Sequence, residues 1–207
     1  MICNVRTLGI SGIQGNVVSA ECYISSGLPA FDIVGLPDAS VKEARERVRA
    51  AAKSSGLKFP VSRITVNLAP ANLKKAGTHY DLPILLSILS AAGEIRRPAA
   101  DCAFLGELSL DGEIRAVSGV LPMALTAAAS GVQALYVPAE NAAEAAEACG
   151  DTMLVYPAHT ALEVVDALRG IRPISPIRCA PFDPTDAWNA APDFADVMGQ
   201  PLARRAM

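Results

Sequence analysis

Two short apolar segments joined by an Asp-Gly pair, within residues 104–117, constrain the fold of this chain more than any other stretch of its sequence. The dipeptide Asp111-Gly112 is a strong signal for a tight β-hairpin, because both central residues of a type I′ turn adopt positive φ. A helical pattern over residues 121–130 follows. We therefore expect a strand, a turn, a second strand and a helix in close succession, a combination uncommon enough to indicate a family.

Composition sets the broad class of the protein. The chain has 207 residues, of which 51% are hydrophobic, so it can bury a sizeable core in one domain followed by a tail. A net charge of −3 gives no global signal for nucleic-acid binding, and any basic surface must be local. Five cysteines without a C-x-x-C pair and only two histidines predict reduced thiols in a cytoplasmic protein and no metal site. No signal peptide and no apolar run of about 18 residues is present, so we expect no membrane span.

Apolar periodicity predicts a chain that contains both strands and helices. Strands are expected at 2–10, 16–24, 31–34, 63–68, 134–137 and 153–156, and helices at 41–55, 84–92, 121–130, 140–149 and 161–168. Ser40 with Glu43 fits a capping box at the start of the first helix, and Gly56 would end it. Asp81 is expected to cap the second helix, which is apolar nearly all round and should be central.

The helix expected at 41–55 carries the most concentrated group of basic residues in the chain. The cations of this helix follow one face and are candidates for nucleic-acid contact: Lys42, Arg45, Arg49 and Lys53. Further candidates elsewhere in the chain are Arg63, Lys74 and Lys75. One interpretation is a solvated face whose ion partners are Glu43 and Glu46. The other is a surface that contacts phosphates or a partner.

Proline becomes frequent after Gly170. Five prolines fall within about twenty residues, a density that opposes regular structure, so residues 171–192 are expected to form an extended linker. Only residues 193–207 follow, which is too short for a domain. The chain therefore reads as one cut off before its next module.

Several long segments of this sequence together resemble the N-terminal domain of the ComM/YifB family of magnesium-chelatase-like AAA+ ATPases. The segments lie at residues 27–38, 41–51, 64–71, 80–84, 104–112 and 137–145. They occur in the order expected of the family, and the resemblance covers essentially the whole chain.

The resemblance implies a Lon-protease-like α+β fold for residues 1–170, a βαβ sandwich of a mixed sheet with helices, of the type seen in one domain of ribosomal proteins. It implies that residues 193–207 begin a truncated AAA+ module, where ATP and Mg²⁺ would bind. The full-length protein would be a cytoplasmic ATPase that forms a ring, expected to be a hexamer, with sister subunits. Its partners would include single-stranded or branched DNA, and its role would be branch migration in recombination during natural transformation.

The chemistry of an enzyme is missing from this chain. An ATPase needs a G-x-x-x-x-G-K-[ST] phosphate loop, and no Gly-Lys dipeptide occurs. A Lon-like fold also suggests a Ser–Lys peptidase, in which a lysine activates a serine. The resemblance places His79, or a neighbour, at the serine position and Leu121 at the lysine position, so this dyad is degenerate. We expect no catalytic, cofactor-binding or metal-binding residue here.

Two functions remain open at this point. The first is a non-catalytic domain that supports DNA binding by the motor, through the basic residues named above. The second is a domain for protein interaction or oligomerisation without nucleic-acid contact, which the acidic pI and the few aromatic residues available for base stacking favour. The sequence does not decide between them.

Overall fold

A single mixed sheet organises the protein, and the computed structural model describes residues 2–178 and 199. Seven strands pair in the order β3-β4-β2-β1-β5-β8-β9, with antiparallel pairing at β4-β2 and β2-β1 and parallel pairing elsewhere. The strands are β1 (Ile2–Ser11), β2 (Gln14–Ser25), β3 (Ala30–Val34), β4 (Arg63–Ala69), β5 (Cys102–Phe104), β8 (Ala134–Pro138) and β9 (Leu154–Ala158). The predicted mixed sheet with helices is confirmed.

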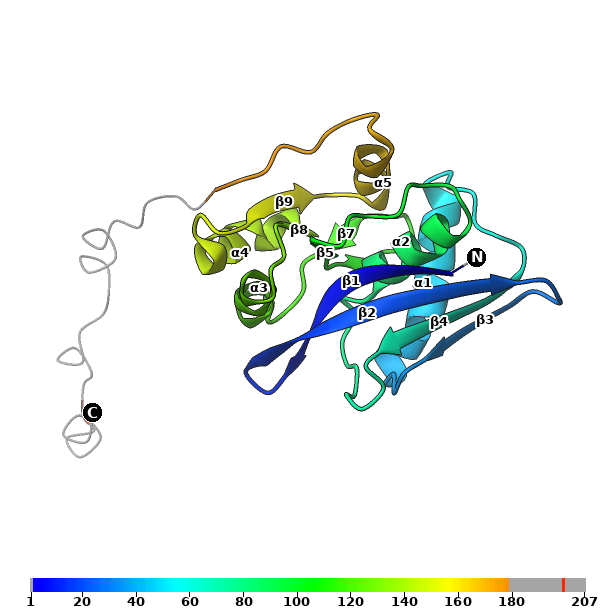
Figure 1. Cartoon of the computed structure of the whole chain (residues 1–207), viewed down its shortest axis with the longest axis horizontal. Helices are drawn as coiled ribbons and strands as arrows, with labels where there is room; N and C mark the ends of the chain where they lie inside the picture. Colours follow the sequence, from blue (N-terminus) through cyan, green and yellow to red (C-terminus); the bar gives the residue numbers. More distant parts are fainter. Residues whose placement is uncertain (1, 179–198, 200–207) are drawn as a thin grey trace.

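Helices cover the two faces of the sheet unequally. They are α1 (Ala39–Ser54), α2 (Asp81–Ala91), α3 (Val120–Ala129), α4 (Ala142–Cys149) and α5 (Ala161–Arg169), with a short 3₁₀ turn at Ala139–Asn141. The helices α1, α2 and α5 share one core cluster with β1 to β4, and α3 and α4 share a second cluster with β8 and β9. In Figure 1, β4 and β3 pass in front of α1, while α3 and α4 lie towards the other end of the molecule.

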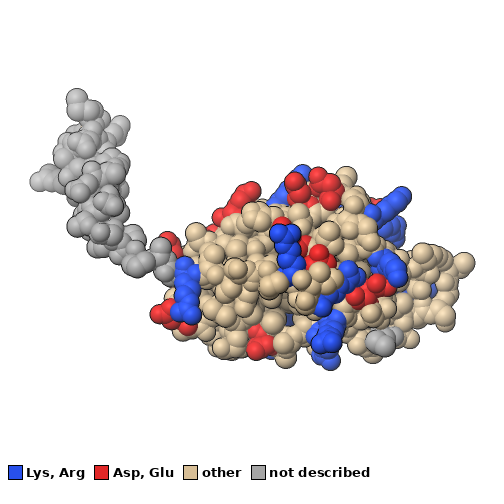
Figure 2. Space-filling view, turned by 90° about the horizontal axis from the view of Figure 1, so that it is seen from above, with Lys and Arg blue, Asp and Glu red and all other residues tan. Residues whose placement is uncertain are grey.

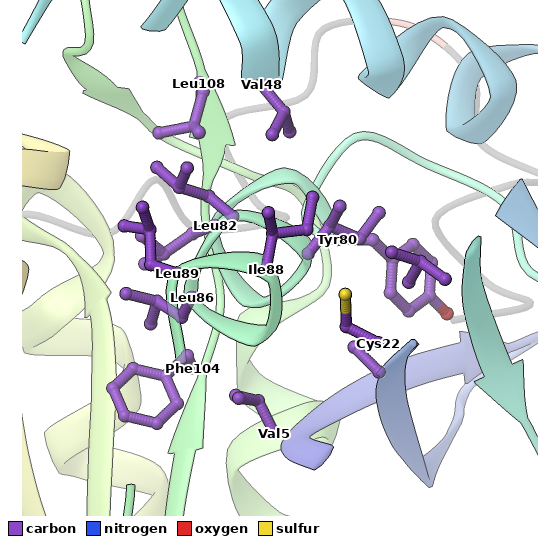
Figure 3. Packing of buried hydrophobic residues seen from close by; sticks show 14 of the residues in the cluster. Val5, Cys22, Val48, Tyr80, Leu82, Leu86, Ile88, Leu89, Phe104 and Leu108 are labelled. Carbon is purple, nitrogen blue, oxygen red and sulfur yellow. The ribbon is translucent and has the colours of Figure 1, made fainter. Parts of the chain in front are cut away.

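The helix α2 is the centre of the larger core. All eleven of its residues are buried, which confirms the prediction of a central helix from its uniformly apolar sequence. Figure 3 shows its side chains between Val48 and Leu108 on one side and Val5 and Cys22 of the sheet on the other. The cysteines Cys3, Cys22, Cys102 and Cys149 carry no disulfide.

The helix α1 begins differently from the prediction. Its N-cap is Asp38, whose carboxylate accepts a hydrogen bond from the Val41 N–H at 2.9 Å. The Ser40 hydroxyl donates to the same carboxylate at 2.7 Å, so the predicted Ser40–Glu43 capping box is wrong. Asp38 displaces Ser40 because its side chain reaches the free N–H groups from an extended backbone just before the helix. Gly56 has a φ of 68° immediately beyond the helix end, as a glycine stop requires.

The hairpin at 104–117 forms, but with a wider turn than the Asp-Gly pair predicts. Its strands β6 (Glu107–Leu108) and β7 (Ile114–Arg115) make a separate two-stranded sheet. Gly112 has a φ of 95°, whereas Leu36 is the only non-glycine residue with positive φ in the part of the chain described, so the turn is not type I′. The Ser109 hydroxyl accepts from the Glu113 N–H at 2.9 Å and stabilises a longer loop.

The structure describes the segment after α5 as far as residue 178. Residues 171–178 run beside β9, where the Ile177 N–H donates to the Val155 carbonyl at 2.8 Å. The rest of the predicted linker at 171–192 lies outside the described residues, as does the predicted module start at 193–207 apart from residue 199.

Candidate functional site

One face of α1 presents a row of cations to solvent. The helix buries Val41, Ala44, Val48, Ala51 and Ala52 against the core. The helical period then places the predicted basic residues on the outer side, and all four are exposed: Lys42, Arg45, Arg49 and Lys53. We call these four residues the α1 cation row.

Neither Glu43 nor Glu46 forms an ion pair with the α1 cation row in the described part of the chain. Glu43 lies 3.8 Å from Arg47, which is not a member of the row, and none of the four cations makes an ion pair within the described residues. Arg45 instead donates to the carbonyls of Lys42 at 3.1 Å and Phe31 at 3.4 Å. Intramolecular pairing with Glu43 and Glu46 therefore does not account for this charge, and the row is available to an external anion.

The structure separates the other three predicted basic residues. Lys74 is exposed and lies near the start of α1. Burial would raise the pKa of Asp38, but hydrogen bonds from Val41 and Ser40, and to a smaller extent the charge of Lys74, lower it. Arg63 alternates with the buried Ile64 on β4, so it faces away from α1, and it lies 3.9 Å from Asp32.

Lys75 is not a surface residue. Its side chain is buried and its ammonium donates to the backbone carbonyls of Pro70 and Leu73, while desolvation lowers its pKa. The loop acceptors satisfy this cation inside the protein, so Lys75 is withdrawn from the predicted nucleic-acid contacts.

A groove of about 580 Å³ opens beside the C-terminal half of α1. Arg49 and Lys53 of the α1 cation row line it, together with apolar side chains from the loop between α1 and β4 and from the starts of β3 and β4. The apolar members are Pro29, Ala30, Leu57, Phe59, Pro60, Val61 and Ile64. The sequence pattern does not show this groove, because Phe59 and Pro60 belong to no periodic element and only the fold places them beside Arg49.

A buried ion pair fixes α1 on the core. The Arg47 guanidinium donates to both carboxylate oxygens of Asp81, at 2.6 and 2.9 Å, and Asp81 also accepts from the Leu108 N–H at 3.1 Å. Burial raises the pKa of Asp81, and the bonds from Arg47 counteract this in part. Asp81 was predicted to cap α2, but α2 has no side-chain cap, because this carboxylate joins α1, α2 and β6 instead.

His79 and Leu121, the two residues that the resemblance assigns to a degenerate dyad, lie in unlike environments. His79 is buried beside Tyr80, with ring centroids 4.1 Å apart; its Nε2 has no hydrogen-bond partner, and burial lowers its pKa to about 4. Leu121 is 43% exposed in the first turn of α3, where its N–H donates to Glu144 at 3.0 Å. A neutral imidazole and an alkyl chain cannot supply the nucleophile and the base of a Ser–Lys dyad.

Charge elsewhere on the surface is mixed. On the face drawn in Figure 2, basic and acidic side chains lie side by side, without one large area of a single sign. In the described part of the chain no helix is long and apolar enough to cross a membrane, and residues 2–178 and 199 contain no group of three metal-ligating side chains. We therefore take the α1 cation row and the groove beside it as the candidate site.

Comparison with known proteins assigns more than half of this chain to one family. Residues 20–141 match the family described as subunit ChlI of Mg-chelatase. The competence protein ComM of Haemophilus influenzae is 38% identical over 199 residues, which is 95% of this chain and 38% of that protein. The uncharacterized protein YifB of Escherichia coli is 36% identical over 206 residues, or 98% of this chain and 39% of its own length.

A more distant similarity extends to a protease. The Lon protease of Mycolicibacterium smegmatis is 26% identical over 140 residues, which is 65% of this chain and 18% of the protease. The chain spans about 39% of the length of the curated ComM and YifB relatives that it matches.

Proposed function

Because the chain belongs to the family of the ChlI subunit of Mg-chelatase, we propose that it is a non-catalytic domain through which a longer ComM/YifB-type AAA+ ATPase contacts DNA. The contact surface is the α1 cation row, with Lys74 near its start. The observation that carries the proposal is a row of four exposed cations that have no carboxylate partner among the described residues, on a chain whose net charge is −3. A local cationic surface of this kind gains affinity for a polyanion by releasing its counterions.

The motor activity resides in the remainder of the full-length protein in this proposal. ATP hydrolysis requires a phosphate loop that residues 1–207 do not contain, so this domain binds, and the AAA+ module moves DNA. Branch migration during natural transformation is the role proposed for the complete ring, and one relative is named a competence protein.

A Lon-protease-like fold is part of the same proposal. It is supported by the similarity to the mycobacterial Lon protease and by a mixed sheet whose helices α1 and α2 cover one face. His79 and Leu121 stand where the protease fold keeps its dyad, and neither can perform the chemistry. The fold is therefore retained here as a binding scaffold.

Salt-dependent binding tests the DNA contact. A fluorescein-labelled single strand of about 20 nucleotides is titrated with the 207-residue chain between about 50 and 200 mM salt, and anisotropy reports binding. Four phosphate contacts predict a slope of about −3 for log K against log salt, at roughly −0.7 per contact on a single strand. Replacing Arg45 and Arg49 by Glu should at least halve that slope and weaken binding at every salt concentration.

The matched control combines Arg96→Glu with Arg115→Glu, at two exposed arginines outside the row that have no ion pair among the described residues. It changes the net charge by as much as the double variant in the row and should leave the slope near the wild-type value. No binding at about 50 mM salt, or equal binding by the double variant, refutes the proposal.

An interaction domain is the second candidate. Leu121 and Leu125 lie one turn apart on α3 and are 43% and 51% exposed, as residues of a protein contact would be. Light scattering distinguishes this candidate: a concentration-dependent dimer that Leu125→Glu abolishes supports it, and a strict monomer at high concentration excludes self-association.

A further inference from the structure

The groove beside α1 combines an apolar lining with two cations. Phe59 lines it, and Val61, which is 84% exposed, forms part of its wall. Arg49 and Lys53, neither of which pairs with a carboxylate in the described residues, line it from α1. We propose, on the basis of the DNA contact proposed above, that this groove receives one unpaired base of a single strand, with Arg49 and Lys53 on the adjacent phosphates.

The aromatic ring in the groove is held in place from behind. The Phe59 and Phe31 ring centroids lie 6.0 Å apart at 49°, and Phe31 is buried and does not line the groove. A braced ring loses little conformational freedom when a flat ligand stacks on it. Stacking on an aromatic side chain is the usual way in which single-strand-binding proteins hold a base without reading its sequence.

The size of the groove fits this occupant. At about 580 Å³ it lies within the range of about 300–1,000 Å³ typical of small-ligand sites, and one base fills only part of it. Its apolar lining matches the faces of a base, whereas its two cations match the charge of the backbone to which the base is attached.

The spacing of the α1 cation row favours a nucleic acid over an acidic peptide. Arg45, Arg49 and Lys53 follow at intervals of four residues, so successive Cα atoms advance by about 6 Å along the helix. Successive phosphates of an extended single strand are separated by a comparable distance. A peptide would need carboxylates at the same regular interval, and the row continues past the groove to Lys42, which a single acidic anchor would not require.

A duplex does not satisfy both parts of the site. Its bases are stacked and paired, so the apolar groove would be left empty while only the cations were used. The geometry therefore predicts a preference for unpaired over paired strands, and for strands with bases over strands without them.

The test compares two strands of equal length. One is oligothymidylate and the other carries abasic residues at every position, so both have the same phosphate charge. The complete 207-residue chain should bind the first about five- to one-hundred-fold more tightly, which corresponds to stacking of about one base. Phe59→Leu and Val61→Asp should each remove most of this difference, and Ile13→Asp, a change at a 90% exposed residue of the β1–β2 turn, should not.

A cross-link on the unaltered protein gives a readout that does not depend on how a variant folds. Replacing thymine by 5-iodouracil and irradiating the complex should attach the strand to the peptide that contains Phe59. Cross-links only elsewhere, or equal affinity for the two strands, overturn the base site while leaving the backbone contact intact. Failure of both strands to bind at low salt overturns the proposed function and, with it, the base site.

Discussion

The buried pair between Arg47 and Asp81 offers the sharpest test of how this fold is held together. Replacing Asp81 by Ala removes a carboxylate that is completely buried and that joins three elements. The change leaves the Arg47 guanidinium without its main partner and the Leu108 N–H without an acceptor. We expect a large loss of stability, with α1 loosened from α2 and from β6.

The magnitude follows from the two groups left behind. Removing one partner of a buried ion pair costs about 3–5 kcal/mol, and an orphaned buried N–H costs about 1–3 kcal/mol. The Arg47 side chain is 18% exposed and donates also to the Ser40 carbonyl at 3.0 Å, so water and that carbonyl retain part of its solvation. We expect the free energy of unfolding to fall by about 3–5 kcal/mol in total.

Urea denaturation followed by circular dichroism at pH 7 measures the effect. The control is Glu43→Ala, because Glu43 also faces Arg47 but its side chain is 74% exposed and 3.8 Å away. A surface pair of this kind contributes at most about 1 kcal/mol. The two substitutions remove carboxylates from the same arginine, so the difference between them measures what burial and the hydrogen bonds to Arg47 and Leu108 add at Asp81.

A double-mutant cycle with Arg47→Met adds a second criterion. Met keeps an apolar side chain of similar length without the charge, so Asp81→Ala should cost less in that background, by at least about 1 kcal/mol. The reasoning fails if Asp81→Ala costs under about 1 kcal/mol, or if the two substitutions are additive.

Two further predictions concern stability. Burial lowers the pKa of His79 from 6.5 to about 4, so folding favours the neutral imidazole. The contribution of this group to the free energy of unfolding is therefore complete above pH 6.5 and is lost as the pH falls towards 4. The free energy of unfolding should therefore drop by about 2 kcal/mol from this group between pH 7 and 5, and His79→Gln, measured by urea denaturation, should remove that component; an unchanged pH dependence contradicts it. Gly35→Ala should cost at least about 2 kcal/mol in thermal denaturation, since Gly35 has a φ of 98° and an added Cβ would lie 2.2 Å from the Leu68 carbonyl oxygen. Gly27→Ala, at a φ of 138° with nothing within 4 Å, should cost less, and equal losses would show that the contact with Leu68 is unimportant.

Local pattern predicted most of the secondary structure correctly. The helices α1 and α2 and the strands β1, β2 and β4 lie within a few residues of their expected positions, because their apolar periodicity is long and regular. The details of caps and turns were less predictable. Asp38 replaced Ser40 at a helix start, and a serine-stabilised loop replaced a type I′ turn, because several neighbouring polar side chains compete for the same few N–H groups.

In the candidate site, too, some features were predictable from the sequence and others were not. The α1 cation row was visible in the sequence, because its members recur at helical spacing and need only a helix to share a face. The burial of Lys75 was not visible in the sequence, since a lysine in a loop becomes buried only when carbonyls such as those of Pro70 and Leu73 surround its ammonium group. The groove at Phe59 likewise depends on a loop that no periodicity describes.

The sequence by itself determined the family, the order of the elements and the helix that carries the charge, because these follow from residue identity and from repeats along the chain. Tertiary structure alone decided which charges remain unpaired. It joined Arg47 to Asp81 across 34 positions, and it left Arg49 and Lys53 beside an apolar groove. Pairing between residues distant in sequence depends on how helices pack, and the chemistry open to this surface is set by that packing.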